Sequence, residues 1–249
     1  MMKAMNKIGL MAALAVIVSV CPANTVSWNY NRYGDAYGTQ STDVAGVGAY
    51  SASYWNDSWL DGRTADLLDN TGAATTIDIS WNSFNSWSIQ QSHPGKDQDG
   101  SYNKEILNGY LNSGPATWNP PLTYSSVTLS EIGYSSYDIV VYFSSDVAGR
   151  EGYVTDGSTT YYFNTVGPAS IASGNALFIQ AADTTEAGYE AAANYAVFKG
   201  LSGTSQTLTV QMRDNDEWGG IAAVQIVQIP EPTSLLLLSL GGLLLRKKA

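Results

Sequence analysis

The sequence predicts an all-β fold, an antiparallel two-sheet sandwich with a hydrophobic segment at each end. Three observations indicate this fold. Apolar and polar residues alternate with a period of two in several segments, as in half-buried strands. Turn signals rich in Gly, Asn and Ser separate these segments every 8–15 residues. No window of twelve residues has a good helical period.

The strands follow from these patterns. In residues 207–213, Leu208, Val210 and Met212 face one side and polar residues face the other. The same alternation occurs at 77–81, where it predicts a buried Trp81, and at 127–129. Two runs that are apolar on both faces, 139–143 and 221–227, are typical of central strands.

Residue types typical of turns predict where these strands are connected. Asp156-Gly157 predicts a hairpin between residues 152–155 and 159–163. Residues 201–205 join two further strands. The alanine-rich stretch 184–194 predicts a loop or a short helical turn. Strands at this spacing, over residues 24–228, favour one jelly-roll domain. The absence of an internal repeat argues against a propeller or a solenoid.

Residues 1–23 have the pattern of a secretory signal peptide. Lys3 and Lys7 form a positive start, and residues 8–20 form an apolar run too short to span a bilayer. Small residues precede a cleavage position after Ala23. A lipoprotein signal at Cys21 is an alternative that we rank lower, because Val20 is unfavourable before a lipidated cysteine.

Residues 229–249 have a comparable pattern. Pro230, Glu231 and Pro232 precede a leucine-rich stretch, residues 234–245, and the chain ends in Arg246, Lys247, Lys248 and Ala249. As a helix, the apolar stretch measures roughly 18 Å, which is short of the roughly 30 Å hydrocarbon layer. The basic cluster would stay on the cytoplasmic side.

This three-part tail resembles the PEP-CTERM sorting signal of exported bacterial proteins. The resemblance implies export by the secretion machinery and transient anchoring in the inner membrane. It also implies processing by an exosortase-type membrane enzyme near Pro230, Glu231 and Pro232. The expected location is the cell envelope or the extracellular space.

The body resembles galactose-binding-like jelly rolls that recur in exported PEP-CTERM proteins. The resemblance rests on residues 67–75, 137–142, 195–201 and 218–226. These stretches are mostly strand and turn signatures, so they imply a fold more than an activity.

Composition excludes several functions. The chain has 22 acidic and 12 basic residues, and residues 24–228 hold 21 acidic and seven basic ones, a net charge of about −14. Nucleic-acid binding needs clustered positive charge, so we expect none. One histidine and one cysteine are too few for a zinc site or a disulfide framework.

Two acidic loops are candidates for a structural Ca²⁺. Asp97, Asp99 and Glu105 lie in a glycine-containing loop, but their spacing differs from that of an EF-hand. Asp214 and Asp216 form a second acidic group beside Trp218. Because Asp, Asn and Gly also favour ordinary turns, both loops have a plain structural explanation.

Tryptophans interleaved with Asn, Asp and Ser are candidates for carbohydrate contacts. They occur in residues 54–59, 81–87 and 118–121. Aromatic faces stack on sugar rings, and amides and carboxylates bond to hydroxyls. Against this, Trp in a sandwich is usually in the core. The candidate contacts are Trp55, Asn56, Asp57, Trp59, Trp118 and Trp218.

No catalytic set is apparent. His93 is the only imidazole, and no Gly-x-Ser-x-Gly elbow accompanies it. We therefore expect a non-catalytic protein of the cell envelope or extracellular matrix. One alternative is a carbohydrate-binding module for extracellular polysaccharide. A second is a glycan-active hydrolase that uses two carboxylates.

Overall fold

The computed structural model describes residues 23–31, 42–59, 62–114, 122–214 and 217–230. Ala23–Ile229 form one compact unit. The predicted signal peptide, except Ala23, and the predicted sorting segment from Glu231 onward lie outside the described residues. Within the described part, no helix is both long and apolar enough to cross a membrane.

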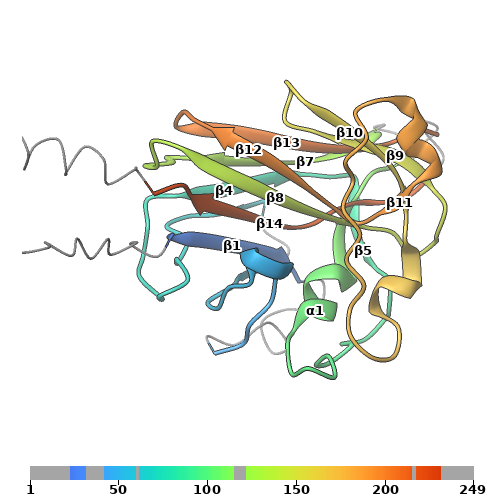
Figure 1. Cartoon of the computed structure of the whole chain (residues 1–249), viewed down its shortest axis with the longest axis horizontal. Coiled ribbons are helices and arrows are strands. Elements are labelled where there is room, and N and C mark those ends of the chain that lie inside the picture. Colours follow the sequence, from blue (N-terminus) through green and yellow to red (C-terminus); the bar gives the residue numbers. More distant parts are fainter. Residues whose placement is uncertain (1–22, 32–41, 60–61, 115–121, 215–216, 231–249) are drawn as a thin grey trace, which may run out of the picture. The chain divides into compact units, whose positions relative to one another are not determined.

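Two large sheets form the body (Figure 1). The first has the order β12-β8-β14-β1-β2 and the second the order β11-β10-β9-β13-β7-β4-β3. The strands of the first sheet are β1 (Thr25–Tyr30), β2 (Asn56–Ser58), β8 (Tyr137–Ser144), β12 (Tyr195–Leu201) and β14 (Gly220–Gln228). Those of the second are β3 (Arg63–Thr64), β4 (Asp78–Asn82), β7 (Tyr124–Ser130), β9 (Glu151–Thr155), β10 (Thr160–Thr165), β11 (Ala192–Ala193) and β13 (Ser205–Met212).

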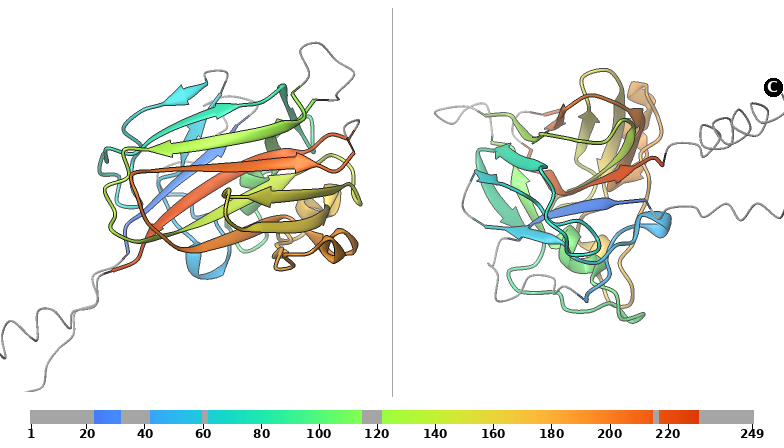
Figure 2. Two further views of the ribbon diagram at one scale, coloured as in Figure 1. Left: turned by 90° about the horizontal axis from the view of Figure 1, so that it is seen from above. Right: turned by 90° about the vertical axis from the view of Figure 1, so that its left-hand side faces the viewer.

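The main core lies between these two sheets, which confirms the predicted sandwich character (Figure 2). Leu208 and Val210 of β13 and Val127 of β7 pack in one cluster with Ile139 of β8 and Val224 of β14. The period-two alternation predicted for β7 and β13 is therefore correct. Trp81 of β4 is only partly buried, and it packs against the edge of this cluster.

The sheets are mixed, so the prediction of purely antiparallel sheets is wrong at two places. β1 pairs with β2 in parallel, and β10 pairs with β11 in parallel. The other strand pairs of the described residues are antiparallel. Side chains alternate between the two faces in both parallel and antiparallel strands, so the alternation in the sequence does not distinguish the two kinds of pairing.

A smaller unit covers the outer face of the first sheet. It contains β5 (Asn85–Ser88), α1 (Asn103–Asn108) and β6 (Gly109–Asn112), and β5 pairs with β6. Val140 and Tyr142 of β8 pack with Ile106 and Leu107 of α1 in a second buried cluster. This cover explains why β8 is apolar on both faces. Helix α1 was not predicted, because its six residues are too few to show a helical period.

The turn predictions are confirmed. Gly157 has a φ of +89°, and Asp156 Oδ1 accepts hydrogen bonds from the backbone N–H groups of Ser158 and Thr159. Residues 202–204 connect β12 of the first sheet to β13 of the second. The alanine-rich stretch contains a short 3₁₀ helix, Glu186–Glu190, and two more such helices occur at Gly48–Tyr50 and Gly167–Ile171.

Candidate functional site

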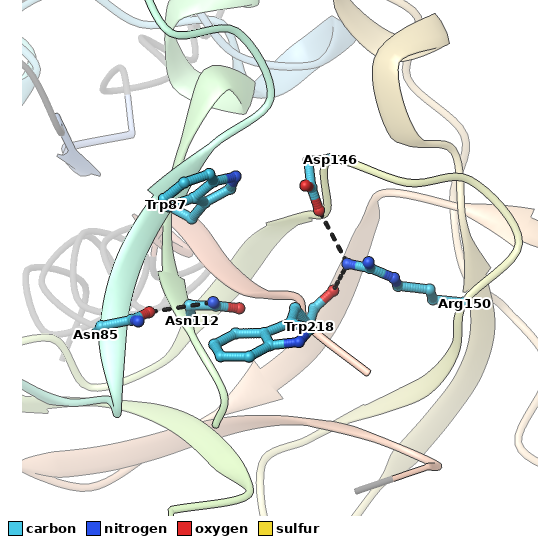
Figure 3. Close-up of a pocket in the computed structure, with 6 residues that line it drawn as sticks. All are labelled: Asn85, Trp87, Asn112, Asp146, Arg150 and Trp218. Atoms are coloured by element: carbon cyan, nitrogen blue, oxygen red, sulfur yellow. Dashed lines mark hydrogen bonds and ion pairs between the residues drawn. The ribbon is translucent and has the colours of Figure 1, made fainter. Parts of the chain in front are cut away.

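One pocket has a volume of about 370 Å³ and is formed where β5 and β6 meet one end of the sandwich. Four separate segments supply its walls: β5, β6, the loop from β8 to β9, and the residues before β14. Figure 3 shows the side chains that line it: Asn85, Trp87, Asn112, Asp146, Arg150 and Trp218.

Two tryptophans supply the apolar surface of the pocket. Trp87 lies on β5 and remains 38% exposed although its register partner on β6, Tyr110, is fully buried. Trp218 is half-buried and meets Phe84 edge-on, with ring centroids 6.0 Å apart. The pocket therefore offers aromatic surface from two segments that are far apart in sequence, β5 and the residues before β14.

An ion pair forms the polar side of the pocket (Figure 3). Arg150 Nη1 donates to Asp146 Oδ1 at 2.9 Å, to the Trp218 carbonyl oxygen at 2.6 Å and to Ser145 Oγ at 3.0 Å. The Asp146 backbone N–H in turn donates to the hydroxyl of Tyr110 at 3.1 Å. These bonds fix both charged groups before any ligand arrives, and the two charges offset each other.

The amide of Asn112 has unused hydrogen-bonding capacity. Asn112 is 2% exposed, and its Nδ2 donates to Asn85 Oδ1 at 3.1 Å. Its Oδ1 accepts no hydrogen bond from the described part of the chain. A buried acceptor without a donor is costly, so a ligand hydroxyl that donates to this oxygen would relieve that cost.

A second pocket of about 500 Å³ adjoins the first and shares Asn85 and Trp87 with it. Its other lining residues are Tyr30, Gly62, Trp81, Asn82, Ser83, Ser86 and Leu111. Its lining again combines aromatic rings with amides and hydroxyls.

The predicted carbohydrate contacts do not gather in one place. Trp218 lines the pocket, and Trp59 is 47% exposed but lines neither pocket. Trp118 lies outside the described residues. Asp57 is half-buried on β2.

Two of the predicted contacts have structural roles instead. Trp55 is 6% exposed, and its indole N–H donates to the carbonyl oxygens of Ala45 and Ala52. The Asn56 side chain donates to the Ser27 and Leu68 carbonyl oxygens and accepts from the Leu68 N–H. We therefore withdraw both as sugar contacts, because the ring face of Trp55 is covered and the amide of Asn56 ties β2 to its neighbours.

The structure describes four of the five predicted calcium ligands, Asp97, Asp99, Glu105 and Asp214. Both carboxylate oxygens of Asp97 accept backbone N–H groups, those of Lys104 and Ala176. Asp99 Oδ1 accepts from the Ser101 N–H, which lowers the pKa of Asp99. Asp214 is exposed, and Asp216 lies outside the described residues. Within the described ranges, no group of three His, Cys, Asp or Glu residues has the arrangement of a metal site.

Glu105 belongs to a buried polar network. Its Oε1 accepts from the Gly95 N–H at 3.2 Å, and its Oε2 lies 3.2 Å from His93 Nδ1. Burial raises the pKa of Glu105 to about 7, and burial also lowers the pKa of His93. The directions of these shifts indicate that the contact is not a strong ion pair. We interpret it as a hydrogen bond that fixes the loop before α1.

Sequence reasoning missed most of the pocket. It marked Trp218 and the tryptophan- and asparagine-rich stretch that ends in Trp87, but it did not single out Trp87 itself. Asn85 lies in the same stretch. Asp146 and Arg150 lie four residues apart in a loop after a buried strand, and nothing in that spacing distinguishes them from ordinary surface charges. Asn112 had no sequence signal.

Comparison of the chain with protein-family models finds no matching family, and comparison with curated proteins finds no match.

Proposed function

We propose that this chain is an exported, non-catalytic β-sandwich protein that binds an uncharged saccharide in the pocket between Trp87 and Trp218. The observation that carries the proposal is the pocket lining: two tryptophan rings, two amides and a balanced ion pair. Aromatic rings stack on the C–H faces of sugars, and fixed polar groups around them bond to hydroxyls.

Charge favours a neutral ligand over an anionic one. The body carries a net charge of about −14, which repels polyanions. Arg150 is the one cation that lines the pocket among the described residues, and Asp146 neutralises it. A neutral extracellular polysaccharide therefore fits better than an acidic one.

Affinity gel electrophoresis on a panel of neutral and acidic polysaccharides tests this function. We expect at least one neutral polysaccharide to retard the purified protein, with and without Ca²⁺. Because stacking on Trp87 would be lost, Trp87→Ala should weaken that retardation by about tenfold. Trp59→Ala is the matched control and should change it by less than about twofold, because Trp59 is exposed but lines neither pocket.

The proposal fails if no polysaccharide in the panel retards the protein. It also fails if Trp59→Ala weakens binding as much as Trp87→Ala does.

Export and sorting rest on the two terminal segments. We propose that residues 1–23 direct secretion and that the PEP-CTERM-like segment, residues 229–249, anchors the chain briefly in the inner membrane before an exosortase-type enzyme cuts it. The mass of the protein recovered from the envelope or medium tests both. We expect a mass that lacks both ends, whereas a full-length mass in the cytosol would contradict the proposal.

We further propose that the sandwich is a jelly roll of the galactose-binding-like kind. Three of the four stretches that carry this resemblance fall in neighbouring strands of one sheet: β12, β8 and β14. The fourth, residues 67–75, forms a turn closed by Asp69, whose Oδ1 accepts N–H groups from Thr71 and Ala73.

One observation favours hydrolysis as a second candidate function. Burial raises the pKa of Glu217, which is next to Trp218 in sequence, and a glycosidase needs one carboxyl group with a raised pKa. Glu217 does not line the pocket, where Asp146 is the one carboxylate among the described residues. The test is whether the protein releases reducing ends from a bound polysaccharide. If it does, and if Glu217→Gln abolishes that release, hydrolysis replaces non-catalytic binding as the proposed function.

A further inference from the structure

The two pockets adjoin each other and share part of their lining. Trp87 and Asn85 line both of them, and Trp87 is 38% exposed. The pockets have volumes of about 370 and 500 Å³, each within the range of about 300–1,000 Å³ that small-molecule sites occupy. A ligand that is long enough can therefore occupy both by crossing Trp87.

The second pocket has the same kind of lining as the first. Trp81 is half-buried and supplies aromatic surface there, and the buried ring of Tyr30 meets it edge-on with ring centroids 6.2 Å apart. Asn82, Ser83 and Ser86 supply amide and hydroxyl groups. No Asp, Glu, Lys or Arg is among the described residues that line it. Two neighbouring pockets of one chemistry are what a polymer of similar units requires.

The backbone holds this arrangement in place. β5 carries Asn85 and Trp87, and it pairs with β6 from Asn85↔Asn112 to Ser88↔Gly109. Trp81 belongs to β4 of the second large sheet, where it pairs with Val127 of β7. Since regular strand pairing holds both β4 and β5, the spacing of the two pockets is built into the fold and does not have to form on binding.

We propose that the site binds a stretch of uncharged polysaccharide chain, with sugar units held on both sides of Trp87, more tightly than it binds a single sugar unit. The inference rests on the proposed function, because it concerns the same site. It adds that the second pocket contributes to affinity only for ligands of two or more units.

A length series of oligosaccharides tests the inference. The probe is the partial acid hydrolysate of whichever polysaccharide retards the protein, separated into oligomers of one to eight units, with affinity measured by calorimetry for each length. We expect affinity to rise by about tenfold or more between one unit and four units, because the second aromatic surface is then engaged.

A variant that fills the second pocket provides the internal comparison. Gly62 lines this pocket, and a Cβ added there would meet only the Trp81 carbonyl oxygen, at 3.7 Å. Gly62→Phe should bind the single unit as the unmodified protein does but lose the gain with length. Gly133→Phe is the matched control, because Gly133 lines neither pocket and has no atom within 4 Å of an added Cβ.

The possible failures are distinguishable. If the single unit binds as tightly as the longer oligomers, or if Gly62→Phe keeps the gain with length, the inference is wrong and the proposed function stands. If no polysaccharide retards the protein, the proposed function itself fails.

Discussion

At the scale of single residues, Glu105 stands out because it is a buried carboxyl group whose nearest side-chain contact is the histidine ring of His93. Burial raises its pKa to about 7 from an ordinary value of 4.5. The folded state therefore holds a proton on Glu105 between about pH 4.5 and 7, where the unfolded chain has released it. The resulting stabilisation is fully present below pH 4.5 and is lost as the pH rises through 7, by about 3 kcal/mol at most.

Glu105→Gln tests this directly. The amide can accept from the Gly95 N–H and donate to His93 Nδ1, as the protonated acid does. We expect similar free energies of unfolding at pH 4 and a more stable variant at pH 8, measured by urea denaturation. The lowered pKa of His93 makes the folded state more stable as the pH rises, which is opposite to the effect of Glu105. Because His93 is present in both proteins, this effect largely cancels when their free energies of unfolding are subtracted.

Asp99→Asn is the control for this experiment, because hydrogen bonding to Ser101 lowers the pKa of Asp99, whereas burial raises that of Glu105. If the unmodified protein and Glu105→Gln differ in free energy of unfolding by the same amount from pH 5 to 8, the raised pKa of Glu105 is contradicted.

At the scale of elements, the backbones of β14 and β6 lie very close together where β14 begins, at Gly220. A Cβ added at Gly220 would lie 1.8 Å from the Leu111 carbonyl oxygen and 2.5 Å from Ser125 Oγ. The Ser113 N–H and hydroxyl both donate to the Gly219 carbonyl oxygen at this crossing. The crossing joins the small unit that carries Trp87 to the sheet that carries Trp218.

We expect Gly220→Ala to lower the free energy of unfolding by about 3 kcal/mol or more, because neither backbone can move aside without breaking these bonds. Gly133→Ala should change it by less than about 0.5 kcal/mol, because nothing lies near the added carbon. Thermal and urea denaturation of the two variants would compare them. Equal free energies of unfolding for Gly220→Ala and Gly133→Ala would contradict the close contact between β14 and β6.

The sequence predicted elements well where burial of one face was decisive. The alternation in β7 and β13 follows from packing against the first sheet. The two-sided apolar runs in β8 and β14 follow from packing against the second sheet on one face and against the unit of β5, α1 and β6 on the other. It could not predict the parallel partner of β1, because β2 is only three residues long and the pairing depends on tertiary contacts. α1 was missed for the same reason: its apolar residues are buried by β8 and β14 and show no pattern of their own.

At the scale of the whole molecule, the candidate site could be predicted only in part. Tryptophans among polar residues marked both Trp55 and Trp218, yet the first is in the core and the second lines the pocket. Residue type and neighbours do not show whether another segment covers a ring. The Asp146–Arg150 pair and Asn112 enter the pocket only because the β8–β9 loop and β6 converge on Trp218.

The distribution of charge across the molecule supports one account of its function. A strongly acidic body surrounds two adjoining pockets whose described lining has no net charge. This distribution fits the proposed function, because a net negative charge repels polyanions and an aromatic lining without net charge suits an uncharged ligand.

The most direct test of this account is a residue-resolved measurement of ligand contact. The indole N–H signals of the tryptophans can be assigned in two-dimensional NMR spectra with single Trp→Phe variants and followed while the binding oligosaccharide is added. We predict shifts for Trp87 and Trp218. We predict none for Trp28 and Trp55, whose indole N–H groups already donate within the core, or for Trp59 outside the pockets. Shifts confined to Trp59, or unchanged signals of Trp87 and Trp218 at saturating ligand, would contradict the account.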